Sequence, residues 1–158
     1  MALITASEII TLVSTRNIDE GHILSTEIAV AENDYVKAAI GADLYAEVVD
    51  DVVTYAEFIE TYIQPVLAYG VLSNIWNRLG VEVTDRGVNS FTGEGITTPQ
   101  VQDKANTLFE IRQRLSSLQR SMIDYAETEY PDLFDSEIEY VTDEVNYYSD
   151  RSKRYNSL

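Results

Sequence analysis

With 158 residues, 45% of them hydrophobic, the chain is long enough to form one domain with a substantial core. Because it contains no cysteine, disulfides, thiolate metal sites and cysteine nucleophiles are excluded. The formal net charge of −16 predicts that most of the surface repels nucleic-acid phosphates, so sequence-specific recognition of DNA or RNA is not expected.

The first half of the chain predicts a series of short helices. Thr5 and Glu8 have the spacing of a capping box, ahead of an apolar helix that ends before Ser14. A second helix is predicted to be capped by Ser25 and to end at Gly41, with Glu32 on its solvent face. A third helix is predicted from Asp43 to near Val53.

The segment from Thr54 to Gly80 predicts the central core helix. Thr54 and Glu57 have the spacing of a second capping box, and the residues that follow are apolar on most sides of a helix, as expected for an element buried on most sides. Pro65 lies inside this segment. Its missing N–H and its ring predict a kink or break near Thr61 and Tyr62.

The organising element is a long helix predicted over about residues 98–130. Thr98 is the expected cap, Pro99 fits the first helical position, and Pro131 ends the helix. One apolar row recurs every seven residues and a second lies beside it: Val101, Leu108, Leu115 and Met122, then Ile111, Leu118 and Tyr125, with Ala105 and Ala126. The stripe fits packing within the chain, which we favour, and it also fits a coiled-coil seam between two chains.

Two segments do not fit a compact helical bundle. Apolar and polar side chains alternate from Val81 to Thr84, and residues 81–97 contain three glycines, which predicts a short β-hairpin or an ordered loop. Residues 136–158 are predicted to form an acidic, tyrosine-rich arm, whose last eight residues include three basic ones. The predicted fold is therefore mostly α: a bundle of four to five helices in residues 1–135, with this insertion, followed by an extended C-terminal arm in residues 136–158. The arm either folds back on its own domain or docks on a neighbour.

Partner contacts are predicted at the insertion, on the polar face of the long helix and on the arm. Exposed aromatic residues bury a large area at low entropic cost, and a cluster of cations either lies in solvent or meets the acids of a neighbouring subunit. The candidate contact residues are Val83, Arg86, Phe91, Arg112, Arg114, Arg120, Tyr140, Tyr147, Tyr148 and Tyr155.

No catalytic constellation is found in the sequence. His22 is the only histidine, no Gly-x-Ser-x-Gly elbow presents a serine, and the glycines of residues 87–95 are not followed by a phosphate-loop lysine. The spacing of a calcium loop is also missing. We therefore expect no enzyme, no cofactor and no metal site. No apolar run approaches bilayer length, and no signal peptide is recognised at Met1 to Ser7.

The order of these segments resembles the small, mostly helical head–tail connector proteins (adaptor or head-completion proteins) of tailed bacteriophages. The resemblance rests on residues 3–8 (Leu-Ile-Thr-Ala-Ser-Glu), residues 40–45 (Ile-Gly-Ala-Asp-Leu-Tyr) and residues 62–68 (Tyr-Ile-Gln-Pro-Val-Leu-Ala). The 81–95 insertion and the closing Tyr130–Pro131 complete it, so it covers most of residues 3–131.

The resemblance implies a structural virion protein. Members of that family form a ring, commonly of twelve identical subunits, beneath the portal of the capsid, where it extends the DNA channel and gives tail proteins a docking platform. It implies contacts with the portal and further tail or connector proteins, passage of DNA without sequence-specific binding, no membrane, and assembly in the cytoplasm of the host bacterium. The alternative is a non-viral helical interaction module that dimerises through the stripe of residues 101–122.

Overall fold

A computed structural model describes residues 3–13, 18, 20–76, 79, 81–84, 87–90 and 101–134, with only the backbone described for residues 81–84, 87–90 and 101–104. The described residues are mostly helical, which confirms the predicted all-α character. The elements are α1 (Ala6–Val13), the 3-10 turn η1 (Glu20–His22), α2 (Ser25–Ala31), the π-helical η2 (Glu32–Lys37), α3 (Ala38–Ile40), α4 (Ala42–Asp50), α5 (Ala56–Phe58), the π-helical η3 (Ile59–Ile63), α6 (Gln64–Ile75), β1 (Val81–Thr84), β2 (Gly87–Ser90) and α7 (Val101–Glu129).

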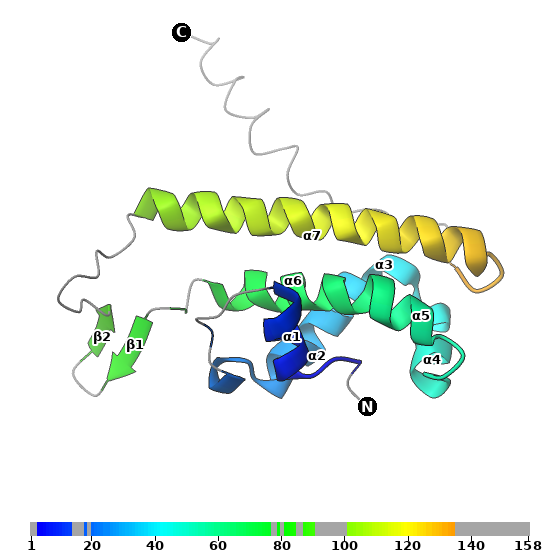
Figure 1. Ribbon diagram of the computed structural model, residues 1–158, viewed down its shortest axis with the longest axis horizontal. Helices are drawn as coiled ribbons and strands as arrows, with labels where there is room; N and C mark the ends of the chain where they lie inside the picture. The colour runs from blue at the N-terminus through cyan, green and yellow to red at the C-terminus, as the bar shows by residue number, and fades with distance from the viewer. Residues whose placement is uncertain are drawn as a thin grey trace, which may run out of the picture.

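Helix α6 lies at the centre of the molecule, as its apolar composition predicts. Helix α7 runs along one side of α6, and α1 and α2 pack on it from the other side (Figure 1). The core therefore gathers around α6, whose Val66, Leu67, Ala68 and Val71 are fully buried. The other helices therefore pack on two sides of the central helix α6, with α7 on one side and α1 and α2 on the other.

Two continuous runs of helix, which we call rods, each contain a π-helical turn. Helices α2, η2 and α3 follow one another without a break, and so do α5, η3 and α6. Turn η3 lies directly before Pro65, which is the second residue of α6. The distortion falls where it was predicted, but it is a widened turn rather than a break, because a π turn relieves the clash between the proline ring and the carbonyl group of the preceding turn.

The helix ends confirm some of the predicted caps and correct others. The backbone N–H of Thr5 donates to Glu8 Oε2 over 2.7 Å, and the N–H of Glu8 donates to Thr5 Oγ1 over 3.3 Å, which confirms the first capping box. Gly41 ends α3 with φ of 87°, a conformation that favours glycine.

Ser25 and Thr54 are not caps, contrary to prediction. Leu24 occupies the N-cap position of α2, so Ser25 is the first residue of the helix. Thr54 donates instead to the Asp51 carboxylate, from its N–H over 3.2 Å and from its hydroxyl over 2.7 Å. Asp51 follows the end of α4, so this pair closes the turn between α4 and α5, and the pKa of Asp51 is lowered by these two hydrogen bonds.

Helix α7 is the predicted long helix. Its described part runs from Val101 to Glu129 and ends before Pro131, and the predicted start at Thr98 and Pro99 lies outside the described residues. Ile111, Leu115, Met122, Ile123 and Ala126 are buried, whereas Ala105 is exposed and does not belong to the packed stripe as predicted. The apolar stripe is therefore occupied within the single chain, chiefly by α6.

Strands β1 and β2 pair in antiparallel fashion. Val81 lies opposite Ser90 and Thr84 lies opposite Gly87, so residues 85 and 86 connect the strands. Val83 pairs with Val88 in this register.

Candidate functional site

The end of α7 is held against α5 and η3 by a cluster of aromatic rings. Phe58, fully buried, lies with its ring centroid 5.4 Å from that of Tyr125 and 5.5 Å from that of Tyr130. Tyr62 stacks on Tyr125 at 4.3 Å, and Tyr55 lies 5.1 Å from Tyr130. Such ring pairs stabilise a contact beyond the area that they bury. They fix the last turn of α7 to one end of the molecule.

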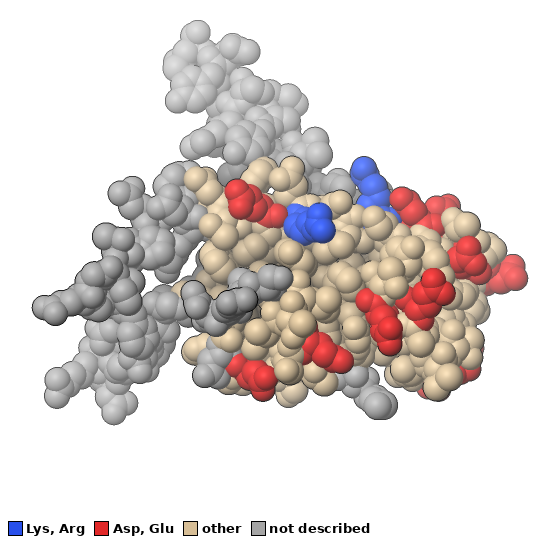
Figure 2. Space-filling view, in the orientation of Figure 1, with Lys and Arg blue, Asp and Glu red and all other residues tan. Residues whose placement is uncertain are grey.

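That end of the molecule is rich in carboxylates, and the described cation beside it is Lys37, whose Nζ lies 6.0 Å from the centre of the Tyr45 ring in α4. Its exposed acids come from α4, the following turn, α5, η3 and the end of α7: Asp43, Glu47, Asp50, Asp51, Glu57, Glu60, Asp124, Glu127, Glu129 and Asp132. Neither residues 38–76 nor residues 121–134 contain Lys, Arg or His. We call these ten residues the acidic end; Figure 2 shows red side chains over the part of the surface where α4, α5 and the end of α7 lie in Figure 1.

The three arginines of α7 lie on its exposed surface, but not in one stripe. Arg112 and Arg114 are two residues apart, so on a helix they project about 160° from each other, to opposite flanks. Arg120 lies between these two directions. The three arginines therefore lie on the polar side of the helix, as predicted, and are spread across its width. The middle of α7 is basic on several sides.

Arg112 faces a polar crossing between three helices. The Tyr35 hydroxyl donates to Asn74 Oδ1 over 2.9 Å, and the side-chain amide of Gln119 donates to the Tyr35 carbonyl oxygen over 3.0 Å. The ring of Tyr35 lies against Gly70, where no side chain intervenes. Burial and the charge of Asp34 raise the pKa of Tyr35, and Arg112 opposes that rise. These contacts join η2, α6 and α7.

Glu32 is half-buried between two other segments, contrary to the prediction that it lies on the solvent face. Its carboxylate accepts hydrogen bonds from the backbone N–H of Leu3 over 3.0 Å and from the hydroxyl of Tyr45 over 3.2 Å. Burial, then the charge and the hydrogen bond of Glu32, raise the pKa of Tyr45 to about 12. Glu32 therefore ties the N-terminal segment and α4 to the rod of α2, η2 and α3.

This contact predicts that stability falls at high pH. Tyr45 ionises near pH 10 in the unfolded chain but near pH 12 in the folded chain, so its contribution is complete below pH 10 and is lost as the pH rises through 12. Urea unfolding between pH 8 and 11.5 should show a steeper loss of stability for the wild type than for Tyr45→Phe. Equal slopes for the two proteins would contradict the assignment, and Tyr69→Phe is the matched control.

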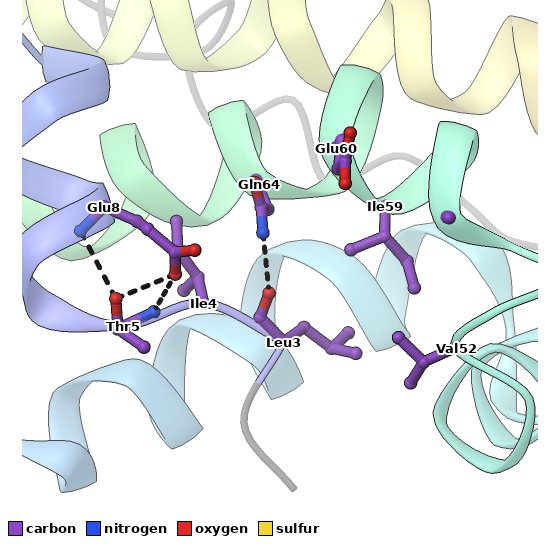
Figure 3. A pocket seen from close by; sticks show the side chains of 9 residues that line it. Leu3, Ile4, Thr5, Glu8, Val52, Ile59, Glu60 and Gln64 are labelled. Atoms are coloured by element: carbon purple, nitrogen blue, oxygen red, sulfur yellow. Dashed lines mark hydrogen bonds between the residues drawn. The ribbon is translucent and has the colours of Figure 1, made fainter.

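A groove of about 250 Å³ lies where the N-terminal segment meets α5, η3 and α6. Its apolar lining comes from Leu3, Ile4, Val52, Ala56 and Ile59, and its polar lining from Thr5, Glu8, Glu60 and Gln64. Figure 3 shows the side chains of Leu3, Val52 and Ile59 converging across it. The sequence indicated none of these residues as part of a binding site; the signal that could have found them is the apolar Val52–Val53 pair in a polar turn.

Among the described residues, no group of three or more His, Asp or Glu side chains is placed to hold a metal ion. In the same ranges, no helix combines the length and hydropathy that a membrane span requires.

Four of the ten predicted contact residues lie within the described part of the chain. Arg112, Arg114 and Arg120 are exposed, as a contact role requires, and Val83 lies in β1 with its backbone alone described. The remaining candidates lie outside the described residues: Arg86, Phe91, Tyr140, Tyr147, Tyr148 and Tyr155.

A comparison with family models decides where the chain belongs. The model of a family of unknown function, DUF6712, matches residues 10–140, which include every described helix from the end of α1 to α7. The chain belongs to the DUF6712 family. No curated protein and no solved structure matches this DUF6712 chain. The charged surfaces and the groove of this family member are therefore interpreted from their own chemistry.

Proposed function

We propose that this DUF6712 protein is a structural component of a phage virion, a head–tail connector that forms a ring beneath the portal. The observation that carries the proposal is the separation of opposite charges on one subunit. Arginines lie on the outer surface of the middle of α7, and the acidic end lies beyond them. Opposite charges on separate surfaces favour head-to-tail contacts, and such contacts close into a ring when the rotation between subunits allows it.

The segments that resemble phage head–tail connector proteins have structural roles in this chain that support the proposal. Thr5 and Glu8 cap α1, Gly41 separates α3 from α4 by its positive φ, and Pro65 follows the π turn in the central rod. A resemblance based on residues that shape the chain is a resemblance of fold. It therefore favours the same architecture more strongly than a match of exposed residues would.

The proposed ring extends the DNA channel without gripping DNA. A chain with a net charge of −16 repels phosphates over most of its surface, so DNA passes along it without sequence-specific contacts. The partners in this proposal are identical subunits, commonly twelve, the portal protein and further tail or connector proteins. The contact elements are the insertion of residues 81–97 and the arm of residues 136–158, in addition to α7. The proposed place is the virion, after assembly in the host cytoplasm.

The first test is the solution mass of the protein, measured by light scattering alone and with the portal protein of the same genome. The proposal predicts a mass near a dozen subunits in at least one of the two. A mass of one or two subunits in both would overturn it.

Charge exchange tests the interface itself. We expect the triple variant Arg112→Glu, Arg114→Glu, Arg120→Glu to lose assembly, because it places acids against the acidic end of the neighbour. The matched control replaces the same three residues by lysine and should still assemble. Adding Glu47→Arg, Asp50→Arg and Glu57→Arg to the glutamate variant should restore assembly, since the charges are then exchanged rather than lost. Unchanged assembly of the glutamate variant would contradict the proposed contact.

A further inference from the structure

The groove between the N-terminal segment and η3 is built before any partner arrives. Its wall at Leu3 is held from two sides, by the backbone N–H bonded to Glu32 and by the carbonyl oxygen that accepts from Gln64 Nε2 over 3.1 Å. The next turn of the wall is fixed by the bonds between Thr5 and Glu8, drawn as dashed lines in Figure 3. A preformed groove binds without paying for its own ordering.

The size of the groove favours one side chain over a small molecule. Its volume of about 250 Å³ is below the roughly 300–1,000 Å³ of a typical small-molecule site. Apolar surface continues beyond its rim, because Val52 is 37% exposed and the neighbouring Val53 is 88% exposed. A peptide with one bulky anchor and a second apolar contact fits this surface.

The rim of the groove selects a basic partner. Glu8 and Glu60 line it, Glu57 is exposed one turn before Glu60, and residues 38–76 contain no cation. Within the chain, residues 151–158 (Arg-Ser-Lys-Arg-Tyr-Asn-Ser-Leu) are complementary: they hold three bases and no acid, with one aromatic residue, Tyr155. We call residues 151–158 the basic tail.

The chain can deliver this segment to the groove. The described chain ends at Phe134, whose backbone N–H bonds to the carbonyl oxygen of Tyr130, and Tyr130 packs on Tyr55 and Phe58. Ala56 and Ile59, the neighbours of those two residues along the chain, line the groove. The described chain therefore ends beside the segment of residues 55–59, which also contributes side chains to the lining of the groove. Sixteen residues separate Phe134 from the basic tail, and an extended chain of that length spans roughly 50 Å.

We propose that the basic tail of this chain docks in the groove, with Tyr155 as its anchor and its basic residues beside Glu57 and Glu60. The proposal is independent of ring formation, because the groove can be filled from the same copy or from a neighbouring one. It assigns a binding surface to the groove and a partner to the only part of the arm that is purely basic.

The absence of cysteine from the chain makes this docking measurable. In the full-length variant Val53→Cys with Asn156→Cys, mild oxidation should form a disulfide between the groove rim and the tail. The yield should exceed, by about three-fold or more, that of Glu110→Cys with Asn156→Cys, which places the first cysteine on an exposed part of α7. An intramolecular product and a cross-linked dimer both support the proposal, and the size of the product on a non-reducing gel tells them apart.

Matched substitutions test the charge and the anchor. In the Val53→Cys, Asn156→Cys background, Glu60→Lys should lower the disulfide yield about three- to ten-fold, whereas Glu110→Lys, with the same change in net charge, should not. Tyr155→Ser should lower it similarly, and Tyr148→Ser should not. Equal yields in either matched pair, or in the two cysteine pairs above, overturn the proposal.

Discussion

Replacing Phe58 by alanine is expected to lower the free energy of unfolding by about 3–5 kcal/mol, the usual cost of removing a large aromatic side chain from a core. The Phe58 side chain is fully buried, and its ring contacts those of Tyr62, Tyr125 and Tyr130. Alanine would remove the centre of this cluster and leave a cavity that its rigid neighbours cannot fill. Urea unfolding monitored by circular dichroism measures the change.

Phe109→Ala is the matched control for this prediction. It makes the same chemical change on α7, but the side chain of Phe109 is 52% exposed, so the expected loss is below about 1 kcal/mol. Similar losses for the two variants would show that the cluster around Phe58 does not hold α7 to α5. A loss confined to Phe58→Ala would support it.

Replacing Gly70 by alanine is expected to destabilise the protein by about 1–3 kcal/mol. A Cβ at position 70 would lie 2.5 Å from Cδ2 and 3.3 Å from Cγ of Tyr35. The ring cannot swing away freely, because the Tyr35 hydroxyl is bonded to Asn74 and its carbonyl oxygen to Gln119. The clash outweighs the gain of about 0.5–1 kcal/mol that alanine brings to a helix.

A double-mutant cycle separates the clash from every other effect of the substitution. In the background of Tyr35→Ala the ring is absent, so Gly70→Ala should be neutral or stabilise the protein by up to about 1 kcal/mol. Thermal unfolding of the four proteins gives the coupling. If Gly70→Ala costs the same with and without the ring, the close approach of η2 to α6 plays no part in stability.

The features that were predictable from the sequence are those whose cause is local. Thr5 and Glu8 cap α1 because the two side chains satisfy each other's backbone N–H across one turn. Gly41 ends a helix through its own φ, and Pro65 distorts the turn directly before it. In each case the residues that decide the structure lie within four positions of one another, so the pattern is visible in the chain.

The features that were missed depend on partners far away in the sequence. Glu32 has the spacing of a solvent-facing residue, but Leu3 and Tyr45 come to it from two other segments. The turn η2 contains no proline, and Tyr35 reaches Gly70 across 35 positions, so neither the π turn nor the close approach leaves a local signal. The Thr54 hydroxyl donates to the Asp51 carboxylate, which precedes it in the chain, instead of capping the helix that follows. The two kinds of hydrogen bond are similar, so the sequence alone does not decide between them.

The candidate surface was predictable in composition and not in arrangement. The sequence places arginines on α7 and acids on either side of it, and the structure spreads Arg112 and Arg114 to opposite flanks. The groove combines Leu3, Val52 and Gln64, which no spacing rule relates. A surface that forms where distant segments cross depends on how the whole core packs. It is therefore not visible in the local spacing of residues.

The two π turns also bear on how relatives of this chain can vary in length. A π turn adds one residue to a helix while the rod on either side continues in the same direction, so it is the structural form of a single-residue insertion. A relative with an unbroken α-helix in place of η2 would be one residue shorter there. Aligned without a gap, all its positions after the turn would be paired with the wrong face of the rod.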